Sequence, residues 1–288
     1  MKKLSMFIFS LILATTAVGA EQQGLDFKVY NAGGHSFHVN STLVTGQTEA
    51  AVIDAGFTKA DALRIVANVL DSGKTLTTIF VSQADPDYYF GVETLKQFFP
   101  DARVLATPRV RKIIKKKMAG KVAYWGPKMG GNAPVKPVLP EAYFESSFSV
   151  DGIKINIRGN EGTLAHRPYL WVPSEKAIIG NVAVFSGVHT WVADSQSQKE
   201  LNAWLAQLAE MKALDPKLVV PGHMSSGSML DKSSIQYTET YLTAFIKAKQ
   251  SSANSAELIE YMNKSYPNAG LQVALSIGAK VHMGEMKW

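Results

Sequence analysis

The chain has 288 residues, a formal net charge of +6 and no cysteine. The absence of cysteine excludes disulfide bonds and any cysteine-ligated zinc site. The charge is mild and does not by itself indicate a nucleic-acid-binding protein, so we expect no nucleic-acid partner. The length permits a single α/β domain with a substantial core.

The N-terminus has the features of an export signal. Two lysines precede an apolar run over residues 6–18, and the small residues Gly19 and Ala20 follow. A charged start, a short apolar core and small residues at the cleavage point are typical of a signal peptide. We therefore expect a signal peptide over residues 1–20, a mature domain over 21–288 and a periplasmic or secreted protein. No later apolar stretch is long enough to span a bilayer, so no membrane span is expected after cleavage.

The first part of the mature chain alternates strand-like and helix-like runs. Strands are expected within 27–56, at 77–81 and at 104–106, and helices at 59–71 and 92–99. Thr58 can cap the first helix, and its apolar face is expected to comprise Leu63, Val66, Val69 and Leu70. This alternation predicts a layered α/β domain.

A strongly basic helix is expected over residues 108–118. Its apolar stripe is Val110, Ile113, Ile114 and Met118, and most other positions are lysine or arginine. The basic face is either solvated or attracts an anionic ligand or an anionic membrane surface. Residues 120–140 are rich in glycine and proline, so we expect an irregular segment there. Such a segment can be a lid over a site, a packed surface arm or a contact between copies of a homo-oligomer.

The second half repeats the order of strands followed by helices. Strands are expected at 153–157, 169–172, 177–179 and 218–220. Amphipathic helices are expected at 197–214, 233–249, 255–264 and 270–279.

A group of polar residues lies between the strand at 77–81 and the helix at 92–99. It has the spacing Gln83-x-Asp85-x-Asp87-Tyr88. Asp87 could simply cap the helix that follows. The spacing also resembles the His-x-His-x-Asp-His metal motif of the metallo-β-lactamase superfamily, in which Asp87 alone keeps its identity here.

Further segments resemble the same superfamily in the same order. These are Ile53-Asp54-Ala55-Gly56, Gly159-Asn160-Glu161-Gly162-Thr163, Ile178-Ile179-Gly180-Asn181-Val182 and Val219-Val220-Pro221-Gly222-His223. The resemblance covers about residues 30–275. It implies a four-layer αββα sandwich with a site at the loop ends of its two sheets. Typical members hold two zinc ions that activate a water molecule for hydrolysis.

The resemblance also assigns the candidate metal ligands. The first metal position corresponds to Gln83, Asp85 and Glu161, the second to Asp87, Tyr88 and His223, and the bridging position to Asn181. Only one imidazole remains, so we expect no dizinc site. Oxygen donors suit one divalent ion such as Mn²⁺, Mg²⁺ or Ca²⁺, with Zn²⁺ a further candidate.

Without a cation, the carboxylates would have to share a proton or recruit a basic residue. Candidates for that residue are Arg158, Arg167 and His166; otherwise His166 is interpreted as structural or surface-exposed. His189 and Trp191 are expected to line the substrate pocket.

Two functions follow from this pattern. In the first, a metal-bound water attacks an ester, lactone or phosphoester of a small molecule, and Asp87 is the catalytic residue. In the second, the fold is kept and catalysis is lost, which leaves a ligand-binding or structural protein.

Overall fold

The computed structural model describes residues 24–288. The predicted signal peptide therefore lies outside the described residues. In the part of the chain that is described, no helix is both long and apolar enough to cross a membrane.

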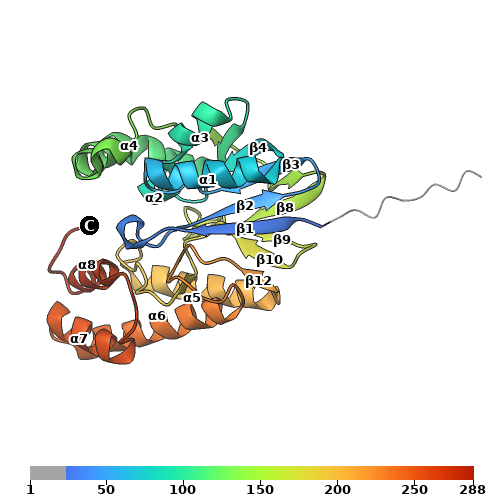
Figure 1. The fold of residues 1–288 in the computed structure, drawn as a ribbon. Coiled ribbons are helices and arrows are strands. Elements are labelled where there is room, and N and C mark those ends of the chain that lie inside the picture. Colours follow the sequence, from blue (N-terminus) through green and yellow to red (C-terminus); the bar gives the residue numbers. More distant parts are fainter. Residues whose placement is uncertain (1–23) are drawn as a thin grey trace, which may run out of the picture.

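Two β-sheets pack face to face, and helices cover the outer face of each (Figure 1). This is the four-layer αββα sandwich that the sequence predicts. Strands of the first sheet are β1 (Asp26–Asn31), β2 (Asn40–Thr45), β3 (Glu49–Ile53), β4 (Thr75–Phe80), β5 (Arg103–Ala106) and β6 (Glu141–Ala142). Strands β1 to β3 pair antiparallel and β3 to β6 pair parallel.

The second sheet has the order β12-β10-β9-β8-β7. Its strands are β7 (Ser147–Val150), β8 (Ile153–Arg158), β9 (Tyr169–Val172), β10 (Ala177–Ile179) and β12 (Leu218–Val219). A separate parallel pair joins β11 (Phe185–Ser186) to β13 (His223–Met224). Apolar side chains fill the space between the two large sheets, including Ile53, Phe80, Ile155, Leu170 and Ile179. Their burial is the main stabilising contribution to this layer.

The helices form the outer layers. On the side of the first sheet lie α1 (Lys59–Ser72), α3 (Val92–Phe98) and α4 (Pro108–Met129). On the other side lie α5 (Gln198–Ala213), α6 (Ser233–Ser251), α7 (Ser255–Ser265) and α8 (Gln272–His282). The predicted helices of the second half are all present, with ends that differ by a few residues.

The predicted apolar face of α1 is partly wrong. Thr58 caps the helix as predicted, with Asp61 completing a capping box, but Leu63 and Leu70 are exposed. The buried face is instead Ala62, Ile65, Val66 and Val69. Asp61 fixes which face of the helix is turned inwards, because its buried carboxylate accepts hydrogen bonds from Tyr30, Ser36 and Thr58.

The irregular segment predicted over 120–140 is wrong in its first part. Helix α4 continues to Met129, and a 3₁₀ turn, η2 (Gly130–Asn132), follows it. Val122, Trp125 and Met129 extend the apolar stripe of Ile114 and Met118 with helical spacing, and they pack against the core. Packing of that stripe outweighs the low helix propensity of the glycine and proline residues in this stretch.

The candidate site residues follow the ends of strands. Asp54 follows β3, the Gln83–Asp87 segment follows β4, Asn181 follows β10, and His223 begins β13. Helix α4 and the end of the chain after α8 lie at one end of the sandwich in Figure 1. A cleft lined by residues from these segments is formed there.

Candidate functional site

The loop after β4 turns directly into a short helix. Asp85 occupies the N-cap position of α2 (Pro86–Tyr89), and Pro86 is its first residue. Asp87 lies in the first turn of α2 and caps no helix, so its predicted capping role is wrong. Gly91 permits a close approach of the chain, because a Cβ there would lie 1.9 Å from the carbonyl oxygen of Ala55. The loop is thereby held against the end of β3.

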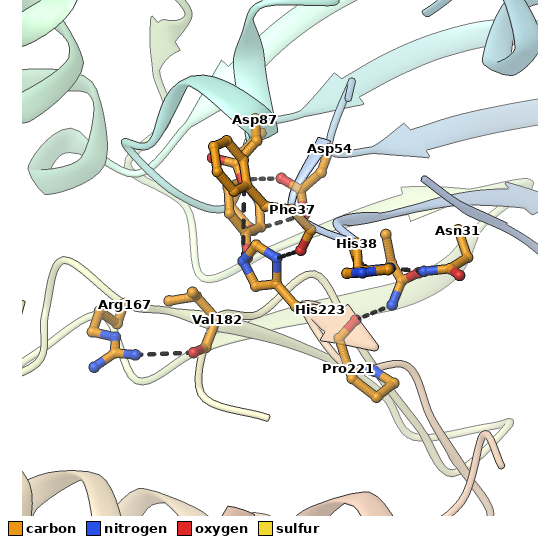
Figure 2. Close-up of polar contacts among 12 residues, drawn as sticks. Asn31, Phe37, His38, Asp54, Asp87, Arg167, Val182, Pro221 and His223 are labelled. Atoms are coloured by element: carbon orange, nitrogen blue, oxygen red, sulfur yellow. Dashed lines mark hydrogen bonds and ion pairs between the residues drawn. The ribbon is translucent and has the colours of Figure 1, made fainter. Parts of the chain in front are cut away.

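His223 is held in one orientation by two hydrogen bonds. Its Nδ1 lies 2.9 Å from the carbonyl oxygen of Phe37, and since a carbonyl only accepts, Nδ1 carries the proton (Figure 2). Nε2 of the neutral ring then accepts from the Tyr88 hydroxyl at 3.0 Å. The Oδ2 atom of Asp87 lies 3.7 Å from the same Nε2. Burial lowers the pKa of His223 to about 4, so the ring is neutral at pH 7.

Burial also favours the protonated, neutral form of the carboxyl groups near His223. Burial, and then the charge of Asp85, raise the pKa of Asp87 well above its usual range. Asp54 accepts hydrogen bonds from the backbone N–H and the hydroxyl of Ser82, yet burial raises its pKa to about 7. Burial also raises the pKa of Tyr88. His223 and Tyr88 are therefore neutral at pH 7, and burial shifts Asp54 and Asp87 towards their protonated forms.

The side chain of Asn181 is engaged with the backbone. Its Nδ2 donates to the carbonyl oxygen of Val220 at 2.9 Å, and its Oδ1 accepts from the N–H of Val184 at 2.8 Å. Asn181 is buried, so these bonds satisfy polar groups that water does not reach. The residue at the predicted bridging position therefore holds together the segments after β10 and β12.

Two further predicted site residues lie outside the cleft. Glu161 is exposed in the segment between β8 and β9 and lines neither cavity of the cleft. His189, predicted to line the pocket, is fully buried, and its ring contacts Tyr241 and Gln272. Trp191 does line both cavities. Gln83, Asp85, Asp87, Tyr88 and His223 are the predicted residues that the cleft brings together.

The donor atoms present do not fit the metal sites that the resemblance implies. Among residues 24–288, no group of three or more histidine, cysteine, aspartate or glutamate side chains is arranged to hold a metal ion. The lone pair of His223 Nε2 is used by the Tyr88 hydroxyl, and the amide of Asn181 is bonded to the backbone. Asp87 is the predicted ligand that remains beside His223.

The cleft consists of two adjacent cavities that share Asp85, Val182 and Trp191. The first has a volume of about 280 Å³ and is lined by Gln83, Ala84, Asp85, Arg109, Ile113, Lys116, Lys117, His166, Arg167, Val182, Trp191 and Asp194. We call it the basic cavity. The second, of about 80 Å³, is lined by Phe37, Phe57, Asp85, Pro86, Asp87, Tyr88, Lys121, Trp125, Val182, Trp191, His223, Leu271 and Trp288. We call it the aromatic cavity.

Helix α4 supplies one wall of both cavities. Arg109, Ile113, Lys116 and Lys117 line the basic cavity, and Lys121 and Trp125 line the aromatic one. These positions recur with helical spacing, so they form one stripe, which shares Ile113 and Trp125 with the apolar stripe that faces the core. The helical period was the signal that could have placed them in the site. Nothing in the sequence pattern singled out Asp194.

Arg167 is the most deeply buried cation of the basic cavity, with a relative exposure of 4%. Its guanidinium donates to the Ser195 hydroxyl at 2.8 Å. It also donates to the Val182 carbonyl oxygen at 2.9 Å (Figure 2). It also lies over the ring of Trp204, 3.8 Å from the centroid. His166, interpreted from the sequence as structural or surface-exposed unless it entered the pocket, lines the same cavity. Burial and the charge of Arg167 lower the pKa of His166 to about 4.

Comparison with known proteins identifies the family. The family model of the metallo-beta-lactamase superfamily matches residues 36–223, more than half of the chain. The chain therefore belongs to the metallo-beta-lactamase superfamily, as the sequence resemblance predicts. No curated protein sequence matches the chain.

Solved structures support the same fold. A metallo-beta-lactamase family protein from Thermus thermophilus is 16% identical with a TM-score of 0.63, covering 91% of this chain and 93% of its own. A beta-lactamase domain protein from Burkholderia ambifaria is 14% identical with a TM-score of 0.62, covering 90% and 84%. A metallo-beta-lactamase from Pontibacter korlensis is 16% identical with a TM-score of 0.50, covering 76% and 94%. At these identities the likeness extends to the fold alone.

Proposed function

We propose that this protein is an exported, ligand-binding member of the superfamily that does not use a metal-activated water. The observation that carries the proposal is the 3.0 Å hydrogen bond between the Tyr88 hydroxyl and His223 Nε2. In a metal-binding histidine, one ring nitrogen bonds the metal and the other donates to a backbone or carboxylate acceptor. Here Nδ1 keeps that second bond, to Phe37, while a phenol takes the place of the metal.

The cleft itself supports binding of a small molecule. It keeps an open volume of about 280 Å³ in the basic cavity and a mixture of charged, aromatic and apolar walls. Small-molecule sites typically combine apolar walls with a few placed polar groups. The periplasmic or secreted location that residues 1–20 predict would expose this cleft to ligands outside the cytoplasm.

The alternative is a metal-dependent hydrolase with one altered site. The specific observation that favours it is the proximity of Asp87 and His223, whose Oδ2 and Nε2 atoms lie 3.7 Å apart. A bound ion would require the Tyr88 hydroxyl to move away from Nε2. Such an ion would polarise an ester or phosphoester and supply the nucleophilic water.

Metal content measured by plasma mass spectrometry distinguishes the two functions. The protein would be exported, purified without chelators and then incubated with Zn²⁺, Mn²⁺ or Ca²⁺ before desalting. We expect no stoichiometric metal in the wild type, in His223→Ala or in Asp87→Ala. His35→Ala provides a control, because His35 is exposed and lies outside the cleft.

About one equivalent of metal in the wild type and in His35→Ala, lost in both His223→Ala and Asp87→Ala, would overturn the proposal. It would favour the altered hydrolase instead. Metal that is retained in all four proteins would lie elsewhere, and the proposal for the cleft would stand.

A further inference from the structure

We propose that the cleft binds an organic oxyanion whose charged group contacts Arg167 and whose flat apolar body lies against Trp191 in the aromatic cavity. This inference deepens the proposed function and rests on it. Three observations carry it: an unpaired buried cation, an excess of positive charge in the basic cavity, and a cluster of indole rings beside it.

Arg167 is a buried charge with no carboxylate of the described residues in direct contact, and the charges of Asp194 and Asp85 act on it from farther away. Within residues 24–288, no carboxylate oxygen lies within 4.0 Å of its guanidinium. Its observed partners, the Ser195 hydroxyl and the Val182 carbonyl, are neutral and leave other N–H groups of the five free. A buried charge is costly unless it is paired, and the guanidinium stays protonated at any ordinary pH. An oxyanion in the basic cavity would supply the missing charge through charge-assisted hydrogen bonds.

The basic cavity carries an excess of positive charge. Arg109, Lys116, Lys117 and Arg167 are cationic, and Asp85 and Asp194 are the acidic residues of its wall. Asp194 is partly engaged, since its Oδ1 accepts from the indole N–H of Trp288 at 2.7 Å. Clefts lined mainly by one sign of charge concentrate ligands of the opposite sign. His166 is neutral at pH 7, so it can either donate to or accept from a ligand.

The aromatic cavity suits the body of the same ligand. Three of the five tryptophans of the chain, Trp125, Trp191 and Trp288, line it. Trp191 and Trp288 lie with ring centroids 5.6 Å apart, and Trp191 also lines the basic cavity. A planar ring beside Trp191 would therefore have its charged substituent directed towards the basic cavity. Aromatic stacking adds to the area that such a ring buries.

Isothermal titration calorimetry with 1-naphthyl phosphate tests the inference. The whole mature protein would be titrated in buffer passed over a chelating resin, so that no metal bridges the ligand. Neutral 1-naphthol and inorganic phosphate are the two comparison ligands. We expect 1-naphthyl phosphate to bind at least about tenfold more tightly than either, because each comparison ligand lacks one of the two recognised groups.

Helix α4 offers a matched pair of variants. Lys116→Ala/Lys117→Ala removes two cations of the basic cavity, whereas Lys112→Ala/Lys115→Ala removes two exposed lysines outside both cavities. We expect the first pair to weaken 1-naphthyl phosphate binding about three- to tenfold and the second pair less than about twofold. Arg167→Met should weaken it further. Because Arg167 is buried, its variant is interpreted only where the melting temperature is close to that of the wild type; otherwise the lysine pairs decide.

Equal affinities for 1-naphthyl phosphate and 1-naphthol would overturn the inference, as would equal losses in the two lysine pairs. A parallel assay for released 1-naphthol separates this inference from the proposed function. Release that depends on His223 would overturn the non-catalytic function, while the affinities would still decide the oxyanion site. Binding that appears only after a divalent metal is added would overturn both.

Discussion

The two ends of the cleft differ in how their buried polar groups are paired. At the His223 end, buried groups bond to neighbours of this chain: His223 to Tyr88 and Phe37, and Asp54 to Ser82. At the Arg167 end, a buried guanidinium has neutral partners and faces further cations across an open cavity. His223 and Asp54 thus have partners within the chain, whereas the proposed oxyanion would supply the direct anionic partner that Arg167 lacks among residues 24–288.

This difference indicates which part of the cleft would bind the proposed ligand. Among the positions that the resemblance assigns to metal ligands, the Tyr88 hydroxyl donates to His223, and the Asn181 amide bonds to the backbone of Val184 and Val220. These contacts hold the loops of this end together. The neighbouring wall, supplied by α4 and by the segment before β9, carries uncompensated charge. Three substitutions test the first end, and a fourth tests Glu161 outside the cleft, in order of expected effect.

The largest effect is expected at Asp54. The pKa of a free aspartate is 3.8, and burial raises the pKa of Asp54 to about 7. Between these two pH values the folded state keeps a proton that the unfolded state has lost. The free energy of unfolding therefore falls as pH rises towards 7 and stays low above it. Asp54→Asn keeps an acceptor oxygen for the Ser82 N–H, lets its Nδ2 donate to the Ser82 hydroxyl oxygen in place of the second contact, and removes the buried ionisation. We expect its stabilising effect to be on the order of 3 kcal/mol larger at pH 8 than at pH 5, at about 1.4 kcal/mol per pKa unit.

Urea unfolding at the two pH values measures this effect. Exposed Asp71→Asn serves as the control and should change the unfolding free energy little at either pH. If Asp54→Asn raises the unfolding free energy no more at pH 8 than at pH 5, Asp54 has an ordinary pKa in the folded protein.

A second large effect is expected for Asn181→Asp, which introduces the residue that the superfamily has at this position. The new carboxylate oxygen would face the carbonyl oxygen of Val220, where Nδ2 now donates. We expect destabilisation of about 2–3 kcal/mol at pH 8, and less at pH 5, where the buried carboxyl can carry a proton. Urea unfolding measures it, with exposed Asn132→Asp as the control. An unchanged stability would mean that the amide is not the structural group inferred here.

A smaller effect is expected for Tyr88→Phe. The change removes the hydroxyl that donates to His223 Nε2 and leaves a buried acceptor unpaired. We expect a loss of about 1–2 kcal/mol in unfolding free energy, with the fold unchanged. Exposed Tyr124→Phe is the matched control. If Tyr88→Phe instead acquires one equivalent of Zn²⁺ that protects it from unfolding, the phenol is what keeps this site free of metal.

The smallest effect is expected for Glu161→Gln. Glu161 is exposed and lines neither cavity. We expect its unfolding free energy to change by less than about 0.5 kcal/mol and its affinity for 1-naphthyl phosphate to match the wild type. A clear loss of affinity, measured by the same calorimetric titration, would place Glu161 in the site after all.

Hydrophobic period and capping allowed most of the fold to be predicted from the sequence. Helix α1 begins after Thr58 and α5 after Ser197, and both have the capping boxes that such sequences favour. The same reasoning failed where two local signals competed. In α4 the glycines and Pro127 suggested a loop, but the stripe through Val122 and Met129 continues the helix.

The candidate site was less predictable than the fold. The resemblance to the superfamily placed Asp87, Tyr88 and His223 in one group, and the structure brings these three residues together. The sequence did not show that Asn181 bonds to the backbone instead of a metal ion. Nor did it show that Glu161 is exposed instead of lying in the site. Those roles depend on which atoms lie within about 3 Å, and sequence spacing does not fix this distance.

The sequence by itself determined the layered architecture and the superfamily, and it shows no histidine at most positions that the resemblance assigns to metal ligands, because these features follow from local patterns and residue identities. The tertiary structure decided which buried polar side chains of the cleft have hydrogen-bond or charge partners within the chain. It placed the Tyr88 hydroxyl on His223 and left the guanidinium of Arg167 facing a cavity. The physical reason is that the cost of a buried polar group depends on its partners, and those come from segments far apart in the chain.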